Sequence, residues 1–187
     1  MSDRLLVFAV DASGSAALAR LAEAKGAVEL LLAEAYARRD HVALISFRGD
    51  NAEVLLPPTR SLVQTKRRLA ELPGGGGTPL AQGLKCSLET AMTSRRKGLS
   101  PLIIVLTDGR SNVALDGSAN RTQAAADVQS VARHIAQAKI DCIVIDTGRR
   151  PETALRDLAL SLRGHYVSLP RADARSLSSA ISQTLEA

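Results

Sequence analysis

The sequence has very few aromatic side chains. Among 187 residues there is no Trp, while Tyr and Phe occur twice each, so aromatic residues make up 2% of the chain. Proteins that bind single-stranded nucleic acid stack bases on aromatic rings. The chain has too few rings for such a platform, and sugar-binding subsites would suffer similarly. Because 45% of the residues are hydrophobic, we expect an ordered core of Leu, Ile, Val and Ala.

Cysteines and long apolar runs are also scarce. The two cysteines, Cys86 and Cys142, are far apart in sequence and fit neither a disulfide framework nor a CxxC metal pair. We interpret both as core residues. No apolar run approaches the roughly 18 residues that a membrane-spanning helix needs, and the chain does not open with a signal peptide. These absences predict a protein of the reducing cytoplasm that does not insert into a membrane.

The charge balance is moderately positive. Lys and Arg number 24 and Asp and Glu 19, which gives a net charge of +5. The basic residues form short scattered groups at residues 38–39, 66–68, 95–97 and 149–150. We interpret these groups as solvated surface that favours acidic partners, since no nucleic-acid-binding module accompanies them.

Apolar runs alternate with helical periodicity along the whole chain. This order predicts an α/β fold: a Rossmann-like, doubly wound, mostly parallel six-stranded sheet with helices on both faces. The predicted strands are residues 5–10, 42–47, 52–56, 102–107, 142–145 and 165–169, and the predicted helices are residues 15–39, 61–72, 79–95, 124–135, 153–162 and about 177–185. The length predicts a single domain over residues 1–187.

Glycines and prolines refine these boundaries. Gly26 marks a possible irregularity in the long first helix. Pro57 and Pro58 are expected to stop the third strand, which suits an edge position. Pro79 is expected at the first helical position of the helix that follows. The polar segment 110–120 is long for a loop of a compact domain, and such loops are often functional.

Oxygen-bearing side chains follow the predicted strands. In an open parallel sheet, ligands bind at the carboxyl ends of the strands, near the point where the strand order reverses. Two carboxylates and three hydroxyls fall there: Asp11, Ser13, Ser15, Thr78 and Asp108. Such hard donors select Mg2+, or alternatively Mn2+ or Ca2+, over zinc or copper. With two carboxylates for a dication, the site has room for one more carboxylate.

The pattern resembles a known metal site. Asp11-Ala12-Ser13-Gly14-Ser15, then Thr78, then Asp108-Gly109 is similar to the metal-ion-dependent adhesion site of von Willebrand factor A (integrin I) domains. The resemblance implies that the serines and the threonine contact the metal directly or through water. It also implies that the aspartates act largely through water and that an acidic residue of a partner completes the shell.

Longer stretches resemble a narrower family. Residues 7–49, 52–84 and 101–112 are similar to the C-terminal domain of magnesium chelatase D subunits. That family inserts Mg2+ into protoporphyrin IX in chlorophyll and bacteriochlorophyll synthesis, with an ATP-hydrolysing AAA+ I subunit and a porphyrin-carrying H subunit. The resemblance implies a non-catalytic interaction domain, the C-terminal part of a longer subunit, that binds the I and H subunits through their acidic residues.

Alternatives remain open from the residues alone. The domain could belong to a cobaltochelatase or to another AAA+-linked complex. A Mg2+-dependent phosphoryl-transfer enzyme could use Asp11 as nucleophile, although Ser13 stands where such sites need a second carboxylate. The glycines at 74–77 lack the GK[ST] ending of a phosphate-binding loop, and we expect no bound nucleotide. Asp146, at the end of a predicted strand, either tunes the metal site or caps a turn.

Overall fold

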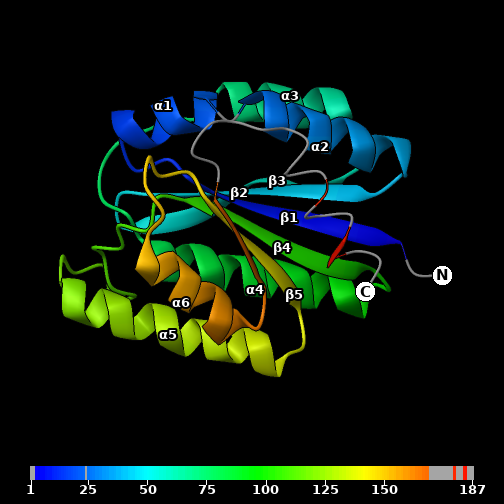
Figure 1. Ribbon diagram of the computed structural model, residues 1–187. Helices are drawn as coiled ribbons and strands as arrows, with labels where there is room; N and C mark the ends of the chain where they lie inside the picture. The colour runs from blue at the N-terminus through cyan, green and yellow to red at the C-terminus, as the bar shows by residue number, and fades with distance from the viewer. Residues whose placement is uncertain (1–2, 24, 169–178, 180–182, 185–187) are drawn as a thin grey trace.

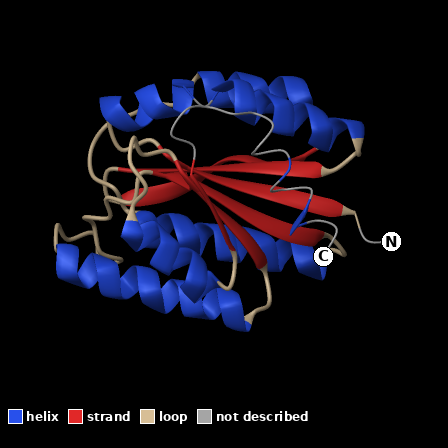
Figure 2. Ribbon diagram, in the orientation of Figure 1, coloured by secondary structure: helices blue, strands red, loops and turns tan. Residues whose placement is uncertain are grey.

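The computed structural model describes residues 3–23, 25–168, 179 and 183–184. These residues form a sheet between two layers of helices (Figure 1). The strands are β1 (Arg4–Asp11), β2 (His41–Arg48), β3 (Asn51–Thr59), β4 (Ser100–Thr107), β5 (Asp141–Asp146) and β6 (His165–Ser168). The helices are α1 (Ser15–Glu23), α2 (Lys25–Ala37), α3 (Leu62–Ala70), α4 (Leu80–Arg96), α5 (Arg121–Gln137) and α6 (Thr153–Leu162). Helices α1, α2 and α3 cover one face, and α4, α5 and α6 cover the other (Figures 1 and 2).

The sheet has the strand order β3-β2-β1-β4-β5-β6. Among the described strands, β2 and β3 pair antiparallel and every other pair is parallel. The predicted fold class is thereby confirmed. The strand order reverses between β1 and β4, which pair in a register that sets Val10 beside Leu106. The carboxyl ends of these two central strands therefore lie side by side, where an open sheet of this type places its ligands.

Alternate residues of the central strands pack into two separate hydrophobic cores. In β4, Ile103 and Val105 pack into the core shared with α4 and α5, whereas Ile104 and Leu106 face the core shared with α1 and α2. Because both faces are covered, the strands are apolar throughout, as in other doubly covered sheets. Phe8 and Phe47 are the aromatic residues of these cores within the described residues. Short strands buried on both faces explain the aliphatic composition.

The third strand does not stop at the prolines, contrary to expectation. It continues through Pro57 and Pro58 to Thr59. The β2–β3 register shifts between Val42 and Leu44, so both prolines fall in the irregular part of the pairing. Proline lacks a backbone N–H and is tolerated at such bulges on an edge strand. The predicted edge position is confirmed, since β3 ends the sheet.

The first predicted helix is two helices, α1 and α2, and Gly26 lies inside the second. The sequence did not reveal the division because Leu21 and Val28, one from each helix, pack into the same core. Pro79 precedes α4 as its N-cap instead of beginning it. Residue 169 of the last predicted strand, and most of the predicted helix at 177–185, lie outside the described residues.

Cys142 is buried and Cys86 is partly buried, and both thiols are free. Burial raises the pKa of Cys142 to about 12 and that of Cys86 to about 11, so both thiols stay protonated and unreactive near neutral pH. Within the described residues, none of the helices combines the length and the apolar character needed to cross a bilayer.

Two glycines inside helices predict opposite effects of the same substitution. A Cβ added at Gly83 of α4 would lie 2.5 Å from Cδ1 of the buried Phe47 ring, whereas one at Gly26 of α2 would meet nothing within 4 Å. Gly26→Ala should raise the free energy of unfolding by about 0.5–1 kcal/mol through helix propensity. Gly83→Ala should lower it by about 1–3 kcal/mol through overpacking. Urea denaturation of both variants measures the difference, and equal signs would contradict the packing described for α4.

Candidate metal site

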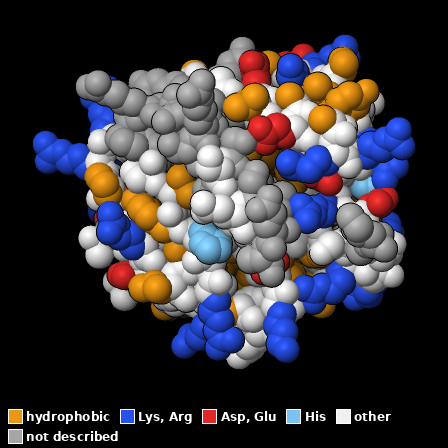
Figure 3. Space-filling model, turned by 45° about the vertical axis from the view of Figure 1, so that its right-hand side comes forward, with side chains coloured by type: hydrophobic (Ala, Val, Ile, Leu, Met, Phe, Trp, Pro, Cys, Tyr) orange, Lys and Arg blue, Asp and Glu red, His pale blue; other side chains and the backbone are white. Residues whose placement is uncertain are grey.

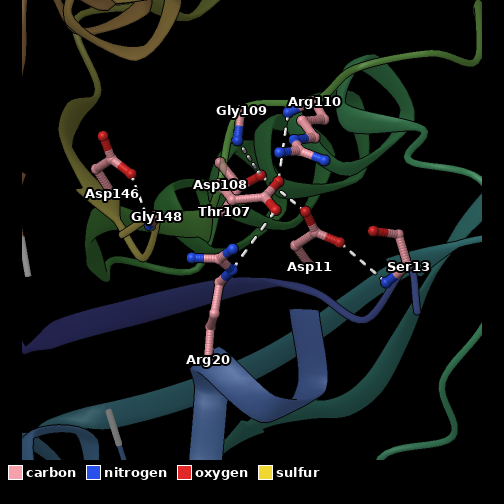
Figure 4. Close-up of polar contacts among 9 residues, drawn as sticks. All are labelled: Asp11, Ser13, Arg20, Thr107, Asp108, Gly109, Arg110, Asp146 and Gly148. Carbon is pink, nitrogen blue, oxygen red and sulfur yellow. Dashed lines mark hydrogen bonds and ion pairs between the residues drawn. The ribbon is translucent and has the colours of Figure 1, made fainter. Parts of the chain in front are cut away.

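Asp11 ends β1 and is only 4% exposed. Its Oδ1 accepts a hydrogen bond from the backbone N–H of Ser13 at 2.9 Å, and its Oδ2 accepts one from the Thr107 hydroxyl at 2.8 Å (Figure 4). Thr107 ends β4, and its Oγ1 also accepts a bond from the backbone N–H of Gly109. These contacts join the ends of the two central strands and fix the carboxylate of Asp11 between them.

Asp108 follows β4 and lies close to Asp11. Figure 4 shows the two carboxylates near each other, with Arg20 of α1 approaching Asp108. Arg20 Nε is 3.9 Å from Asp108 Oδ2, and Asp108 Oδ1 accepts a long bond of 3.4 Å from the backbone N–H of Arg110. Two carboxylates and one guanidinium therefore meet at the carboxyl edge of the sheet.

Burial raises the pKa of Asp11 above its ordinary value of 3.8. The negative charge of Asp108 acts in the same direction, while the hydrogen bonds from Ser13 and Thr107 act in the opposite direction. The raised pKa means that ionising Asp11 costs more free energy in the folded protein than in the unfolded chain. A cation beside Asp11 and Asp108 would offset both causes of the rise, the burial and the like charge.

Thr78 is tied to the loop that follows β4. Its backbone N–H donates to Asn112 Oδ1 at 2.8 Å, and the Asn112 N–H donates to the Thr78 carbonyl at 3.3 Å. Thr78 is 4% exposed. The N–H of Gly75 donates to the Ala12 carbonyl at 3.0 Å, which links the glycine run to the loop after β1. Hydrogen bonds thus join three loops that are distant in sequence into one group. We call this group the loop cluster; it comprises residues 12–14, 71–79 and 108–120.

The glycine run is explained by close packing. A Cβ added at Gly77 would lie 2.6 Å from Val113 and 2.9 Å from the Gly49 carbonyl oxygen. Gly76 has a φ of +85°, and a Cβ there would lie 2.8 Å from the Cα of Gly49. Larger residues would push apart the loops after β2 and β4 that flank the run.

The structure brings together most of the predicted metal-binding residues. Asp11, Ser13 and Asp108 cluster, and the segment carrying Thr78 is bonded to the loops after β1 and β4. Ser15 begins α1, but its side chain is outside what the structure describes, so its role stays a prediction. The described residues include no group of three or more His, Cys, Asp or Glu side chains that could hold a metal. A cation at this edge would depend on hydroxyl and carboxylate oxygens, a donor set that fits Mg2+.

Three residues that shape the site were not predicted from the sequence: Arg20, Thr107 and Asn112. Thr107 carries a signal in the sequence, because a hydroxyl at the end of a buried apolar run usually has a partner. Arg20 and Asn112 carry none, since their contacts join segments far apart in the chain.

Asp146 has the surroundings of a residue that organises a turn. It is fully buried, and its carboxylate accepts bonds from the backbone N–H groups of Gly148 and Glu152 and from the Tyr166 hydroxyl, at 2.7 to 2.8 Å. Burial, with the bond to Asp146, raises the pKa of Tyr166. Of the two interpretations left open for Asp146, these contacts favour the turn between β5 and α6.

The fold is that of a von Willebrand factor type A domain, and the profile of that domain matches residues 6–183. The chain belongs to this family. Solved structures agree on the fold: BatB from Bacteroides thetaiotaomicron has a TM-score of 0.72 at 18% identity, covering 98% of this chain and 100% of that one. The SpRpn10 VWA domain has a TM-score of 0.65 at 17% identity, covering 98% and 95%.

Within the family, the chain is similar to magnesium chelatase subunits. It is 60% identical to the magnesium-chelatase 60 kDa subunit of Cereibacter sphaeroides over 96% of its length, and 58% identical to that of Rhodobacter capsulatus over 100%. The 67 kDa subunit of Chlorobaculum parvum is 44% identical over 94% of the chain. The chain spans about a third of the length of these relatives, 30–33%.

The raised pKa of Asp11 predicts a specific pH dependence of stability. The folded protein keeps a proton on Asp11 at pH values where the unfolded chain has lost it, so stability falls as the pH rises through the folded-state pKa. Asp11→Asn cannot ionise and should escape this loss. In EDTA, the free energy of unfolding of the variant minus that of the wild type should increase from about pH 4 to about pH 7. Chemical denaturation across this range tests it, and a constant difference would mean that Asp11 ionises normally.

Proposed function

We propose that this chain is the metal-dependent interaction domain of a magnesium chelatase D-type subunit. The observation that carries the proposal is the 58% identity over all 187 residues to a magnesium chelatase subunit. The parent complex would use ATP to insert Mg2+, as its substrate, into protoporphyrin IX. The domain itself would bind the AAA+ I subunit and the porphyrin-carrying H subunit.

A resident divalent cation, Mg2+ first, would be held by residues in and beside the loop cluster. Ser13, Ser15 and Thr78 would contact it directly or through water, and Asp11 and Asp108 would act through water. The bound cation would supply an electrophilic centre for an acidic side chain of the partner. The hydrogen bonds from Ser13 and Thr107 restrict the orientation of the Asp11 carboxylate, which would favour a fixed position for the cation.

The surroundings of Asp11 favour binding over catalysis. Both of its oxygens accept hydrogen bonds and it is almost fully buried, which suits a structural carboxylate better than a nucleophile. The residue two positions later is Ser13, which cannot act as the acid and base of a phosphoryl-transfer site. The hollows of about 630 and 550 Å3, between β3 and α4 and between α1 and α3, are lined by none of the candidate residues.

The charge distribution supports an acidic partner. Arg48 ends β2, and Arg110 and Arg149 lie on the loops that follow β4 and β5; all three are exposed at the edge that carries the candidate site. On the face shown in Figure 3, basic side chains lie in small separate groups with acidic and uncharged atoms between them. Arginines around the site would speed encounter with acidic segments, and added salt should weaken this steering.

Removing a metal-binding residue should abolish partner binding without unfolding the domain. Thr78→Ala and Asp11→Ala should each lose Mg2+-dependent binding to the AAA+ I subunit, because each removes an oxygen that the cation requires. Thr93→Ala and Asp141→Ala, at exposed positions of α4 and β5, are matched controls that should bind normally. Surface plasmon resonance in Mg2+ and in EDTA measures binding, and circular dichroism checks the fold.

Binding that persists in EDTA and in both site variants would exclude the metal bridge. Turnover of p-nitrophenyl phosphate by the wild-type chain, lost in Asp11→Ala, would instead favour the phosphoryl-transfer alternative.

A further inference from the structure

Arg20 places a positive charge inside a candidate cation site. It comes from α1, its side chain is 18% exposed, and its Nε lies 3.9 Å from Asp108 Oδ2 (Figure 4). This distance is too long for a hydrogen bond, so the two groups form a loose ion pair. The positive charge of this guanidinium repels a dication and so lowers the affinity of the site for one.

The donors of Arg20 point to an absent acceptor. Its Nε and Nη1 atoms are buried and have no hydrogen-bond partner among the described residues. Buried N–H groups are normally paired, because leaving them unpaired costs the full free energy of desolvation. A guanidinium presents its donors in a planar fork that matches the two oxygens of a carboxylate. The unpaired donors of Arg20 therefore suit a carboxylate arriving from outside the chain.

The charges of the site also favour a carboxylate as the additional ligand. When both carboxylates are ionised, Asp11, Asp108 and Arg20 together carry one net negative charge. A bound dication would convert it to one net positive charge, whereas without Arg20 the loaded site would be neutral. With Arg20 present, one anion would neutralise the metal-loaded site. Before any anion binds, the site attracts a cation less strongly than two carboxylates without Arg20 would.

We propose that Arg20 makes cation binding at this site depend on the incoming carboxylate. Its charge weakens binding of the dication to the free domain, and its unpaired N–H groups donate to the carboxylate that also contacts the metal. Cation and carboxylate then bind cooperatively, each raising the affinity for the other by the same factor. This inference rests on the proposed function, because it assigns Arg20 a positioning role at the same site.

The test uses Mn2+ as a spectroscopic substitute for Mg2+ and acetate as the carboxylate. Free Mn2+ is followed by electron paramagnetic resonance during titration of the 187-residue chain, in acetate and in chloride at equal ionic strength. In chloride, Arg20→Met should bind Mn2+ at least about tenfold more tightly than the wild type, because a nearby like charge is removed. Acetate should tighten Mn2+ binding to the wild type and have a smaller effect on Arg20→Met.

Three further variants separate charge from structure. Arg20→Lys keeps the charge and should bind Mn2+ as the wild type does. Arg20→Gln removes the charge but keeps a polar side chain, so it should bind Mn2+ as tightly as Arg20→Met. It replaces Arg20→Met in the test if Arg20→Met folds poorly in EDTA. Arg38→Met is the matched control, because Arg38 pairs with Glu34 and Asp40 before β2, at the opposite edge of the sheet. It should leave Mn2+ affinity unchanged.

The outcomes are distinguishable. If neutral variants at Arg20 bind Mn2+ equally or more weakly than the wild type, Arg20 only supports Asp108 and the inference is wrong. An acetate effect of the same size in wild type and Arg20→Met would overturn the cooperative part. If neither the wild type nor any Arg20 variant binds Mn2+ in either salt, the metal site fails, and both the inference and the proposed function fall.

Discussion

The parallel pairing of β1 with β4 positions Asp11 and Thr107 at the centre of the candidate site. Their register sets Val10 beside Leu106, so Asp11 and Thr107 emerge together at the strand ends and form the hydrogen bond between them. A slip of one strand by one residue would turn the side chains of that strand to the opposite face and break this bond. The register is held by apolar residues such as Phe8 and Ile104, which pack in the core on one face. The polar site is therefore placed by the hydrophobic core beneath it.

The sequence was informative wherever a local pattern has a local cause. Continuous apolar runs predicted β1 and β4 because strands buried on both faces need apolar residues at every position. Patterns failed where tertiary packing decides the outcome. Pro57 and Pro58 signalled a strand end, but the bulge beside β2 accommodates them. The contacts of Arg20 and Asn112 join residues far apart in the chain, and no local pattern in one sequence encodes such distances.

The loop cluster and the residues beside it concentrate groups that a purely structural edge of the sheet would avoid. A buried carboxylate with a raised pKa, a second carboxylate, and an arginine with unpaired donors lie together. Such departures from well-satisfied packing are expected where a protein binds something. Domains with the same fold at 18% and 17% identity keep the architecture on largely different sequences. The fold alone therefore does not specify what this domain binds.

The two edges of the sheet limit how copies of this domain can associate. Pro57 and Pro58 remove two backbone donors from β3, and β6, at the other edge of the described sheet, has only four residues. Within the described residues, neither edge offers a long row of free N–H and C=O groups on which another strand could add. Pairing of strands between copies of this chain is thus disfavoured at both edges, so contacts between copies would form through loops and side chains.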